Sequence, residues 1–369
     1  MTVRHLLVFG PFAYLTLFFL YPLLAILGRS FDGGQLSFDP FKTVLSDPYY
    51  LGRIWFTITQ AAVSMVITLA VGLPAAYLFA KHQFPGKTLL KALTTLPFIM
   101  PTIVVAMGFV ALLGPQGLVN TALMNLFELD DPPVRVANTM AIILMAHAFY
   151  NYAIVVRIVS AFWGNLTPRF EESAMMLGAG RVQVFLHVTL PLLLPAITSA
   201  AVLVFTFSFT SFGVVLMLGG PQFATMEVAI YDLTVTVFKL ELAGALAVVQ
   251  MIFTYVFLLV YTRFQQHTGV PIGLVPQQVV LTRKRRKTDI ALVMVIVAGL
   301  LVLLSPLVAL VDRAASVDNS RSLVHFINLF SNDSGSYFYL SPLVIIWNSV
   351  RLALISMVIA LAVGTAAAY

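Results

Sequence analysis

The sequence contains no cysteine, so it can form neither a disulfide bond nor a thiolate metal site. Charged residues are also scarce, at 10% of the chain, whereas 60% of the residues are hydrophobic. This composition excludes an ordinary soluble globular protein, which needs a larger charged surface. Apolar runs of about 20 residues, long enough to cross the hydrocarbon core of a bilayer as helix, recur along the chain. The sequence therefore predicts an all-α polytopic membrane protein.

Residue patterns of common enzymes are missing as well. Gly86-Lys87-Thr88 resembles the end of a phosphate-binding loop, but Lys81 stands where that loop needs its first glycine. There is no HExxH or GxSxG pattern, and no acidic residue lies within a predicted membrane segment. We therefore expect this chain to have no catalytic residues, no cofactor and no metal site. The net charge of +6 is attributed to orientation in the membrane, and nucleic-acid binding is not expected.

Eight apolar segments define the predicted topology. With the N-terminus in the cytoplasm, 13 of the 21 Lys and Arg residues lie on the cytoplasmic side, together with 3 of the 15 Asp and Glu residues. This is the asymmetry that the positive-inside rule describes. The first segment is too long for a signal-peptide core and lacks a cleavage site, so an uncleaved helix is expected. The segments are 6–28, 54–80, 89–113, 136–161, 191–218, 243–263, 290–311 and 344–369.

The segments that connect the predicted membrane helices have sequence patterns that predict their structure. Residues 29–53 and 114–135 are predicted outer loops with turn formers such as Asp32-Gly33-Gly34. Residues 225–238 have the apolar spacing of an amphipathic helix on the outer face, although their β-branched residues leave a strand open. The linker 265–289 ends in the run Arg283-Lys284-Arg285-Arg286-Lys287, which suits a cytoplasmic segment that meets anionic lipid.

An internal repeat links the two ends of the chain. Residues 55–77 and 347–369 are identical at 13 of 23 positions at a constant offset of 292 residues. Shared hydrophobicity alone does not produce a match of this length. We therefore predict one complete six-helix unit followed by the start of a second, homologous unit, which we expect to be truncated. The expected divisions are 1–50 for the first helix and outer loop, 51–264 for the first unit, 265–289 for the linker and 290–369 for the second unit.

The polar stretch 167–191 interrupts the middle of the chain. Thr167-Pro168 indicates a helix start, and Glu171 and Glu172 suit the positive end of its dipole. Gly178 predicts a sharp reversal between two short helices, because glycine tolerates positive φ. Leu190-Pro191 marks the start of the next membrane helix. The sequence therefore predicts a compact helix–turn–helix that protrudes into the cytoplasm.

The spacing of Glu172, Ala174, Gly178, Leu190 and Pro191 resembles the EAA loop of the membrane subunits of ABC importers. Two positions differ mildly from that pattern, with Ser173 in place of alanine and Val188 in place of isoleucine. The resemblance implies an inner-membrane permease that contacts ABC ATPase subunits, two copies of them, through this loop. It also implies a separate substrate-binding protein as a partner. ATP hydrolysis is then expected in the partner subunits.

A narrower resemblance involves the segment from Leu218-Gly219-Gly220-Pro221-Gln222 to Tyr231, together with Ala146-His147 and Asn151. It is similar to fused, two-unit thiamine and ferric-iron permeases. The implied function is translocation of a small solute of the thiamine or ferric-iron type. Glu227 and Asp232 are candidate contacts for the loaded binding protein. Helices alone leave the substrate open among thiamine, ferric iron, a polyamine and a phosphonate.

Several polar residues and prolines lie within predicted spans. Polar groups inside a membrane indicate function by default, but hydrogen bonding between helices is the competing explanation, and we favour it for the pair His147 and Asn151. Pro97 and Pro101 predict a kink in the third segment, because proline removes backbone donors. The candidate pathway residues are Pro97, Pro101, His147, Asn151, Ser208 and Ser211.

An ion-coupled secondary transporter is the alternative from another class. It predicts carboxylates within the membrane or unwound half-helices at matching positions of the two repeats. The carboxylates are missing, and the EAA spacing would be a coincidence. A membrane scaffold without transport leaves both the repeat and the loop unexplained. The sequence therefore favours an ABC importer permease.

Overall fold

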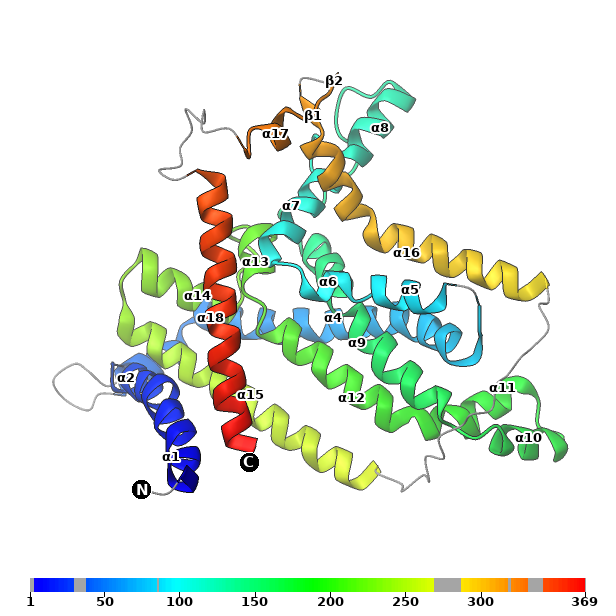
Figure 1. Ribbon diagram of the computed structural model, residues 1–369, viewed down its shortest axis with the longest axis horizontal. Coiled ribbons are helices and arrows are strands. Elements are labelled where there is room, and N and C mark those ends of the chain that lie inside the picture. Colours follow the sequence, from blue (N-terminus) through cyan, green and yellow to red (C-terminus); the bar gives the residue numbers. More distant parts are fainter. Residues whose placement is uncertain are drawn as a thin grey trace. The chain divides into compact units, whose positions relative to one another are not determined.

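A computed structural model describes residues 3–29, 38–84, 86–268, 287–317, 320–330 and 341–368. These residues are helical apart from turns, loops and one antiparallel pairing of two-residue strands, β1 (Ser316–Val317) with β2 (Ser320–Arg321) (Figure 1). In this part of the chain, seven helices are long and apolar enough to cross a membrane. The predicted all-α polytopic fold is therefore confirmed. The seven are Pro48–Lys81, Thr102–Phe127, Met140–Gly164, Arg181–Phe209, Leu240–Arg263, Val297–Ala314 and Pro342–Ala367.

The chain divides into two compact units. The terminal unit comprises Met1–Lys42, Lys239–Ala245 and Val311–Tyr369. In it, the predicted first segment forms three consecutive helical pieces, and the stretch Phe9–Leu20, which extends over the first two, is a shorter apolar helix. The first of these pieces packs against α18, the helix that carries the second copy of the repeat. The helices of this unit are α1 (Val3–Leu15), the π-helix η1 (Thr16–Leu20), α2 (Tyr21–Arg29), α17 (Val324–Ile327) and α18 (Pro342–Ala368).

The central unit comprises Thr43–Phe238 and Leu246–Leu310. It holds the EAA-like stretch and all the polar membrane residues singled out above. Its helices are α4 (Pro48–Lys81), α5 (Lys87–Leu93), α6 (Leu96–Ile99), α7 (Thr102–Leu113), α8 (Leu118–Phe127), α9 (Met140–Gly164), α10 (Arg169–Met176), α11 (Arg181–Val184), η2 (Phe185–Thr189), α12 (Leu190–Phe209), α13 (Gly213–Leu218), α14 (Met226–Tyr231) and η3 (Asp232–Thr236). Three further helices, α3 (Asp39–Ser46), α15 (Leu240–Thr268) and α16 (Lys287–Ala314), contribute residues to both units.

The core of the central unit is a bundle of α4, α9 and α12, each of which packs against the other two (Figure 1). Small residues allow α4 and α9 to approach closely. A Cβ atom added to Gly72 would lie 2.7 Å from Cγ1 of Val155, which is fully buried. Close approach of helix backbones at small residues is typical of membrane helix packing, where dispersion forces replace the hydrophobic effect. This bundle fixes the positions of the polar side chains that α4 and α9 carry.

A second cluster packs α7, α9, α13 and the start of α14 together. Its fully buried members include Val105 of α7, Ile143 of α9 and Val215 of α13, and Phe109 meets Phe149 edge-on at 5.6 Å between ring centroids. The short helix α13 is therefore held by α7 and α9, although it is separated from α12 by three residues. The two clusters meet along α9, which runs through both.

The structure corrects two predicted spans. Segment 89–113, expected to be one kinked helix, is broken into α5, α6 and α7, and the long apolar stretch runs instead from Thr102 to Phe127. Pro97 opens α6, and Pro101, in an extended conformation with Met100, precedes α7. Segment 191–218 is likewise interrupted between α12 and α13. Mean hydropathy does not detect such breaks, because the residues on both sides remain apolar.

Other connecting segments are more ordered than turn formers suggest. The predicted outer loop 114–135 contains α8, whose buried Asn120 accepts from the Val134 N–H at 2.8 Å and donates to the Gly114 carbonyl at 2.8 Å. The helix predicted within 225–238 is confirmed as α14 and η3, in preference to a strand. The turn Asp32–Gly34 and residues 269–286 of the predicted basic linker lie outside the described residues.

We expect Gly72→Val to destabilise the bundle by about 1–3 kcal/mol, because the added atoms collide with buried Val155. The measurement is the midpoint of thermal unfolding of the purified protein in detergent. Gly52→Val, on the same helix with no atom within 4 Å of its added Cβ, is the matched control. Equal midpoints for the two variants would show that the close approach at Gly72 does not limit stability.

Candidate functional site

The stretch 167–191 folds into a helix–turn–helix whose reversal is set by backbone hydrogen bonds. Gly178, two residues after the end of α10, has a φ of +89°. The Gly178 N–H donates to the Met175 carbonyl at 3.0 Å, and the Ala179 N–H donates to the Ala174 carbonyl at 3.1 Å. These two bonds form a Schellman motif, which ends a helix through a left-handed residue. The predicted reversal at Gly178 and the helix start after Pro168 are both confirmed.

An ion pair anchors this loop to the end of α4. Lys81 Nζ lies 3.0 Å and 3.1 Å from the two carboxylate oxygens of Glu171, and Thr189 Oγ1 donates to Glu171 Oε1 at 3.1 Å. Both charged side chains are about three-quarters covered, at 23% and 27% exposure, so the pair is more than a loose surface contact. Glu171 therefore connects α4, α10 and the π-helical turn η2 that leads into α12.

The far side of the loop is exposed and apolar. Met176 and Leu177, at the tip, are 89% and 88% exposed, and Val182 is 71% exposed. Glu172 is also exposed, whereas Ala174 is half-buried beneath the turn. Leu190 and Pro191 begin α12, as predicted. Exposed apolar residues on a rigid projection are typical of a protein-interaction surface, although the sequence patterns drew attention to the glutamates and the glycine instead.

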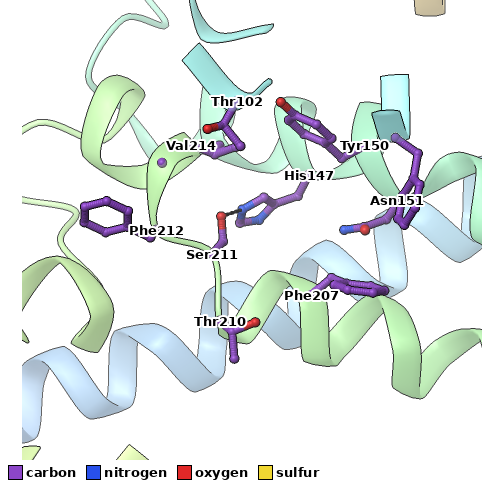
Figure 2. Close-up of a pocket in the computed structure, with 11 residues that line it drawn as sticks. Thr102, His147, Tyr150, Asn151, Phe207, Thr210, Ser211, Phe212 and Val214 are labelled. Atoms are coloured by element: carbon purple, nitrogen blue, oxygen red, sulfur yellow. Dashed lines mark hydrogen bonds between the residues drawn. The ribbon is translucent and has the colours of Figure 1, made fainter. Parts of the chain in front are cut away.

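A cavity of about 420 Å³ lies in the central unit at the break between α12 and α13 (Figure 2). Its volume is in the range of small-molecule sites. His147 occupies the centre of the view, with Asn151 and Phe207 on one side and Thr210 and Ser211 on the other (Figure 2). The lining residues are Phe98, Thr102, His147, Tyr150, Asn151, Phe207, Thr210, Ser211, Phe212, Gly213 and Val214.

The polar side chains of this region are fixed by hydrogen bonds from neighbouring helices. His147 is 2% exposed, with Nδ1 3.0 Å from Ser64 Oγ of α4 and Nε2 2.8 Å from Ser211 Oγ in the break. Asn151, 3% exposed, donates to Ser208 Oγ at 3.2 Å. Both side chains are thus held between α4 and the end of α12, so they line the cavity in defined orientations.

Two further side chains satisfy backbone groups that the helix breaks leave without helical partners. Gln60 Nε2 donates to the Ser208 carbonyl at 2.7 Å, next to the end of α12. Tyr150 donates its hydroxyl proton to the Met100 carbonyl at 3.3 Å, at the break before α7. Buried carbonyls need such partners, above all in a medium without water. The fold therefore supplies hydrogen-bond partners for backbone carbonyls at both breaks.

The predicted pathway residues divide into three groups. His147, Asn151 and Ser211 line the cavity, so the face that His147 and Asn151 share is both hydrogen-bonded and open to a cavity. Ser208 is fully buried behind Asn151. Pro97 and Pro101 do not line the cavity, but the breaks that they cause bring Phe98 and Thr102 to it. All six positions belong to the central unit.

Sequence reasoning missed the aromatic part of the lining. Phe98 and Phe207 meet edge-on, with ring centroids 5.8 Å apart. The chain has 29 Phe residues, and in sequence those that face a cavity look the same as those that face lipid. The only available signal was their position, since Phe98 lies between the two prolines and Phe207 lies one residue before Ser208.

The two candidate binding-protein contacts differ in their surroundings. Glu227, in the first turn of α14, accepts a hydrogen bond of 2.6 Å from Gln250 Nε2 of α15. Burial raises the pKa of this carboxyl above its ordinary value of 4.5, and the hydrogen bond from Gln250 opposes that rise. Asp232 begins η3 and is half-buried. The carboxylate of Glu227 is therefore turned toward α15.

Comparison with known proteins defines the class of this chain. Residues 68–270, more than half of the sequence, match the family of binding-protein-dependent transport system inner membrane components. The chain belongs to this family, and it is a multi-pass permease subunit of a binding-protein-dependent ABC importer, a transport component without catalytic activity. Family membership therefore decides against the secondary-transporter alternative.

The curated relatives of this chain are named for the transport of different substrates. The chain is 30% identical over 249 residues to the sulfate transport system permease protein CysT of Salmonella typhimurium, covering 68% of this chain and 87% of CysT. It is 30% identical over 303 residues to the thiamine transport system permease protein ThiP of Brucella abortus, covering 81% of this chain and 54% of ThiP. It is 24% identical over 262 residues to the putative 2-aminoethylphosphonate transport system permease protein PhnU of Salmonella paratyphi A, covering 70% and 91%.

Solved structures support the fold. The subunit of a bacterial ABC transporter involved in import of the acidic polysaccharide alginate matches with a TM-score of 0.60 at 20% identity, covering 69% of this chain and 92% of that chain. A structure of the alginate transporter in complex with its pentasaccharide-bound periplasmic protein matches with the same TM-score at 21% identity, covering 72% and 94%. These matches show a shared helical architecture, and they leave the substrate of this chain open.

Replacing Gln60 tests whether its hydrogen bond to the Ser208 carbonyl stabilises the break after α12. We expect Gln60→Leu to lower stability by about 1–3 kcal/mol, because the buried Ser208 carbonyl loses its donor. The measurement is thermal unfolding in detergent. Thr59→Val is the matched control, since the Thr59 hydroxyl donates to the Trp55 carbonyl of its own helix. An equal loss in both variants would contradict a special role for Gln60.

The raised pKa of Glu227 predicts the direction in which the stability of the folded protein changes with pH. Its folded-state pKa is raised, so the stability tied to the protonated carboxyl is full below 4.5 and is lost as pH rises through the folded-state pKa. We expect Glu227→Gln to remove this fall while it keeps the bond from Gln250. Unfolding midpoints measured from pH 4 upward, with Asp232→Asn as the control, check the prediction. A wild-type profile that rises with pH over this window would contradict it.

Proposed function

We propose that this permease imports a small organic solute of the thiamine type, delivered by a binding protein outside the membrane and driven by two copies of a separate ATPase. The carrying observation is the lining of the cavity, which combines aromatic rings with uncharged polar groups. The 81% coverage of this chain by its match to a thiamine permease supports the same class. Ferric iron, the other predicted cargo, would need several hard oxygen ligands, and the lining contains no carboxylate.

The EAA-like loop supports a coupling role. A permease that moves in response to ATP must receive force through a projection that does not bend. The loop is stiffened by the Schellman motif at Gly178 and anchored by Glu171 to Lys81. Its exposed apolar tip, Met176 and Leu177, suits a groove on the ATPase. In this proposal Glu172 and Gly178 lie at the contact, and Ala174, Leu190 and Pro191 hold the loop against the membrane helices.

The two ends of α4 support opposite membrane sides for the loop and for α14. Thr57 Oγ1 accepts from the Met226 N–H of α14 at 2.9 Å, whereas Lys81 pairs with the loop. The 24 residues between these positions span about 36 Å of helix, more than the hydrocarbon thickness. With the loop and the N-terminus in the cytoplasm, as the distribution of basic residues favours, Glu227 and Asp232 lie on the side that a binding protein reaches.

The repeat supports a second, homologous unit. The positions that α4 buries in its bundle include Ala61, Ser64 and Gly72, and the same residue types recur in α18 as Ala353, Ser356 and Gly364. A pathway between two such units, opening alternately to either side, is the arrangement that we propose. This chain spans about half the length of ThiP, one of the relatives that it matches.

Replacing Gly178 tests the coupling role. We expect Gly178→Val to reduce the ATPase activity stimulated by the loaded binding protein at least tenfold, because a β-branched residue disfavours the φ of +89° that the turn requires. Gly178→Asn is the matched control, since asparagine tolerates this conformation and is expected to keep most of the stimulation. The measurement uses the permease reconstituted with its ATPase and binding protein.

Two substitutions at the contact surface complete this test. We expect Leu177→Asp and Glu172→Lys to leave membrane insertion intact and to reduce co-purification of the ATPase with the permease. Leu89→Asp, at another exposed apolar position near the same end of α4, is the control for added charge. Normal association and transport in both loop variants would overturn the assignment of the loop as the ATPase contact.

A further inference from the structure

The cavity at the α12 break has the construction of a binding site rather than of a packing defect. Its volume of about 420 Å³ exceeds by far the space that one water molecule occupies. The polar residues at its wall are held by a second layer of side chains, with Ser64 behind His147 and Ser208 behind Asn151. Side chains held in this way present fixed groups to a ligand, which is how a site gains selectivity.

The lining combines two kinds of side chain. Phe98 and Phe207 meet edge-on, and Phe207 lies on the same side of His147 as Asn151 (Figure 2). Thr102, Thr210 and Ser211 supply hydroxyl groups on the other side of His147, where the ring of Phe212 also lies (Figure 2). The lining contains no Asp, Glu, Lys or Arg. A ligand would therefore meet aromatic rings and neutral hydrogen-bonding groups on both sides of the cavity.

This combination favours one ligand class. Aromatic rings stack on flat rings and attract delocalised positive charge. Hydroxyl and carboxamide groups bind the donors and acceptors at the edge of a heterocycle. An oxyanion such as sulfate would have to lose its hydration without any cationic side chain in the lining to replace it. The lining therefore suits a heteroaromatic solute that is neutral or carries a single delocalised positive charge.

We propose that this cavity is a solute-binding site within the permease itself, which takes a small flat heteroaromatic solute after the binding protein releases it. The inference rests on the proposed import function and adds a second point of selection to it. Phe98 and Phe207 bind the ring of the solute. Asn151, Thr102 and Ser211 form hydrogen bonds with the polar groups at its edge. His147 acts as a positioning residue, because both of its ring nitrogens already face serine hydroxyls.

The break between α12 and α13 gives the site a means of release. Ser211 and Thr210 belong to the three-residue connection, whereas Asn151 and Tyr150 belong to the uninterrupted helix α9. Because α13 also packs against α9, a displacement that separates the two sides of the site has to shift α13 along α9, and it does not require a helix to unfold. Gly213, at the start of α13, has no room for a Cβ against the Thr102 side chain, so α13 and α7 are expected to move together.

The test uses the permease assembled with its ATPase, with radiolabelled thiamine as the probe. Equilibrium binding is measured on the assembled complex without binding protein, with sulfate as a competitor. Thiamine import into proteoliposomes is then measured with binding protein. We expect saturable thiamine binding that sulfate does not displace, and a loss of affinity on the order of tenfold in Phe207→Leu. Phe253→Leu, a partly exposed phenylalanine on α15 outside the cavity lining, is the matched control and should bind like the wild type.

A second variant guards against a folding defect. Phe98→Leu alters the other ring of the Phe98–Phe207 pair, from a different helix, and should weaken binding in the same way. Thiamine import that is equal in both variants and the control, with no binding to the complex alone, would overturn the cavity site and leave the proposed import intact. Import of sulfate with no response to thiamine would overturn both the site and the proposed substrate class.

Discussion

The central unit depends on one constraint, namely that every backbone group inside a membrane needs a hydrogen-bond partner. The breaks after α12 and before α7 remove helical partners, and side chains of intact helices replace them. Gln60 reaches the Ser208 carbonyl, and Tyr150 reaches the Met100 carbonyl. Because these two side chains come from α4 and α9, the packing of those two helices determines whether a cavity can exist at the breaks.

Helices of the same bundle connect the cavity with the EAA-like loop. α9 carries Asn151 within the cavity wall and ends just before the loop, and α12 begins at the loop and ends beside Phe207. Thirteen residues of helix separate Asn151 from the end of α9, about 20 Å. In the proposed coupling role, a displacement of the loop is transmitted along two packed helices to the side of the cavity where Asn151 and Phe207 lie (Figure 2). The ion pair of Lys81 with Glu171 adds α4 to this connection.

Sequence patterns were sufficient for the helical membrane fold, the reversal at Gly178 and the shared face of His147 and Asn151. They failed where the outcome depends on tertiary contacts. Helix breaks at 210–212 and 94–101 are invisible to hydropathy, since the flanking residues stay apolar. Phe207 could not be told from a lipid-facing phenylalanine, because both are apolar residues in a helix. Glu227 was read as an outward charge, whereas its hydrogen bond to Gln250 forms only in the folded chain.

In the EAA-like loop, the residues that set its shape differ from the residues that it exposes at its tip. Its turn is formed by backbone hydrogen bonds around Gly178, and its attachment depends on Glu171, so Met176 and Leu177 at the tip contribute little to either. Substitutions at these two positions can therefore accumulate without loss of stability. In the coupling role proposed above, the same membrane scaffold can be matched to a different ATPase by changes at the tip alone.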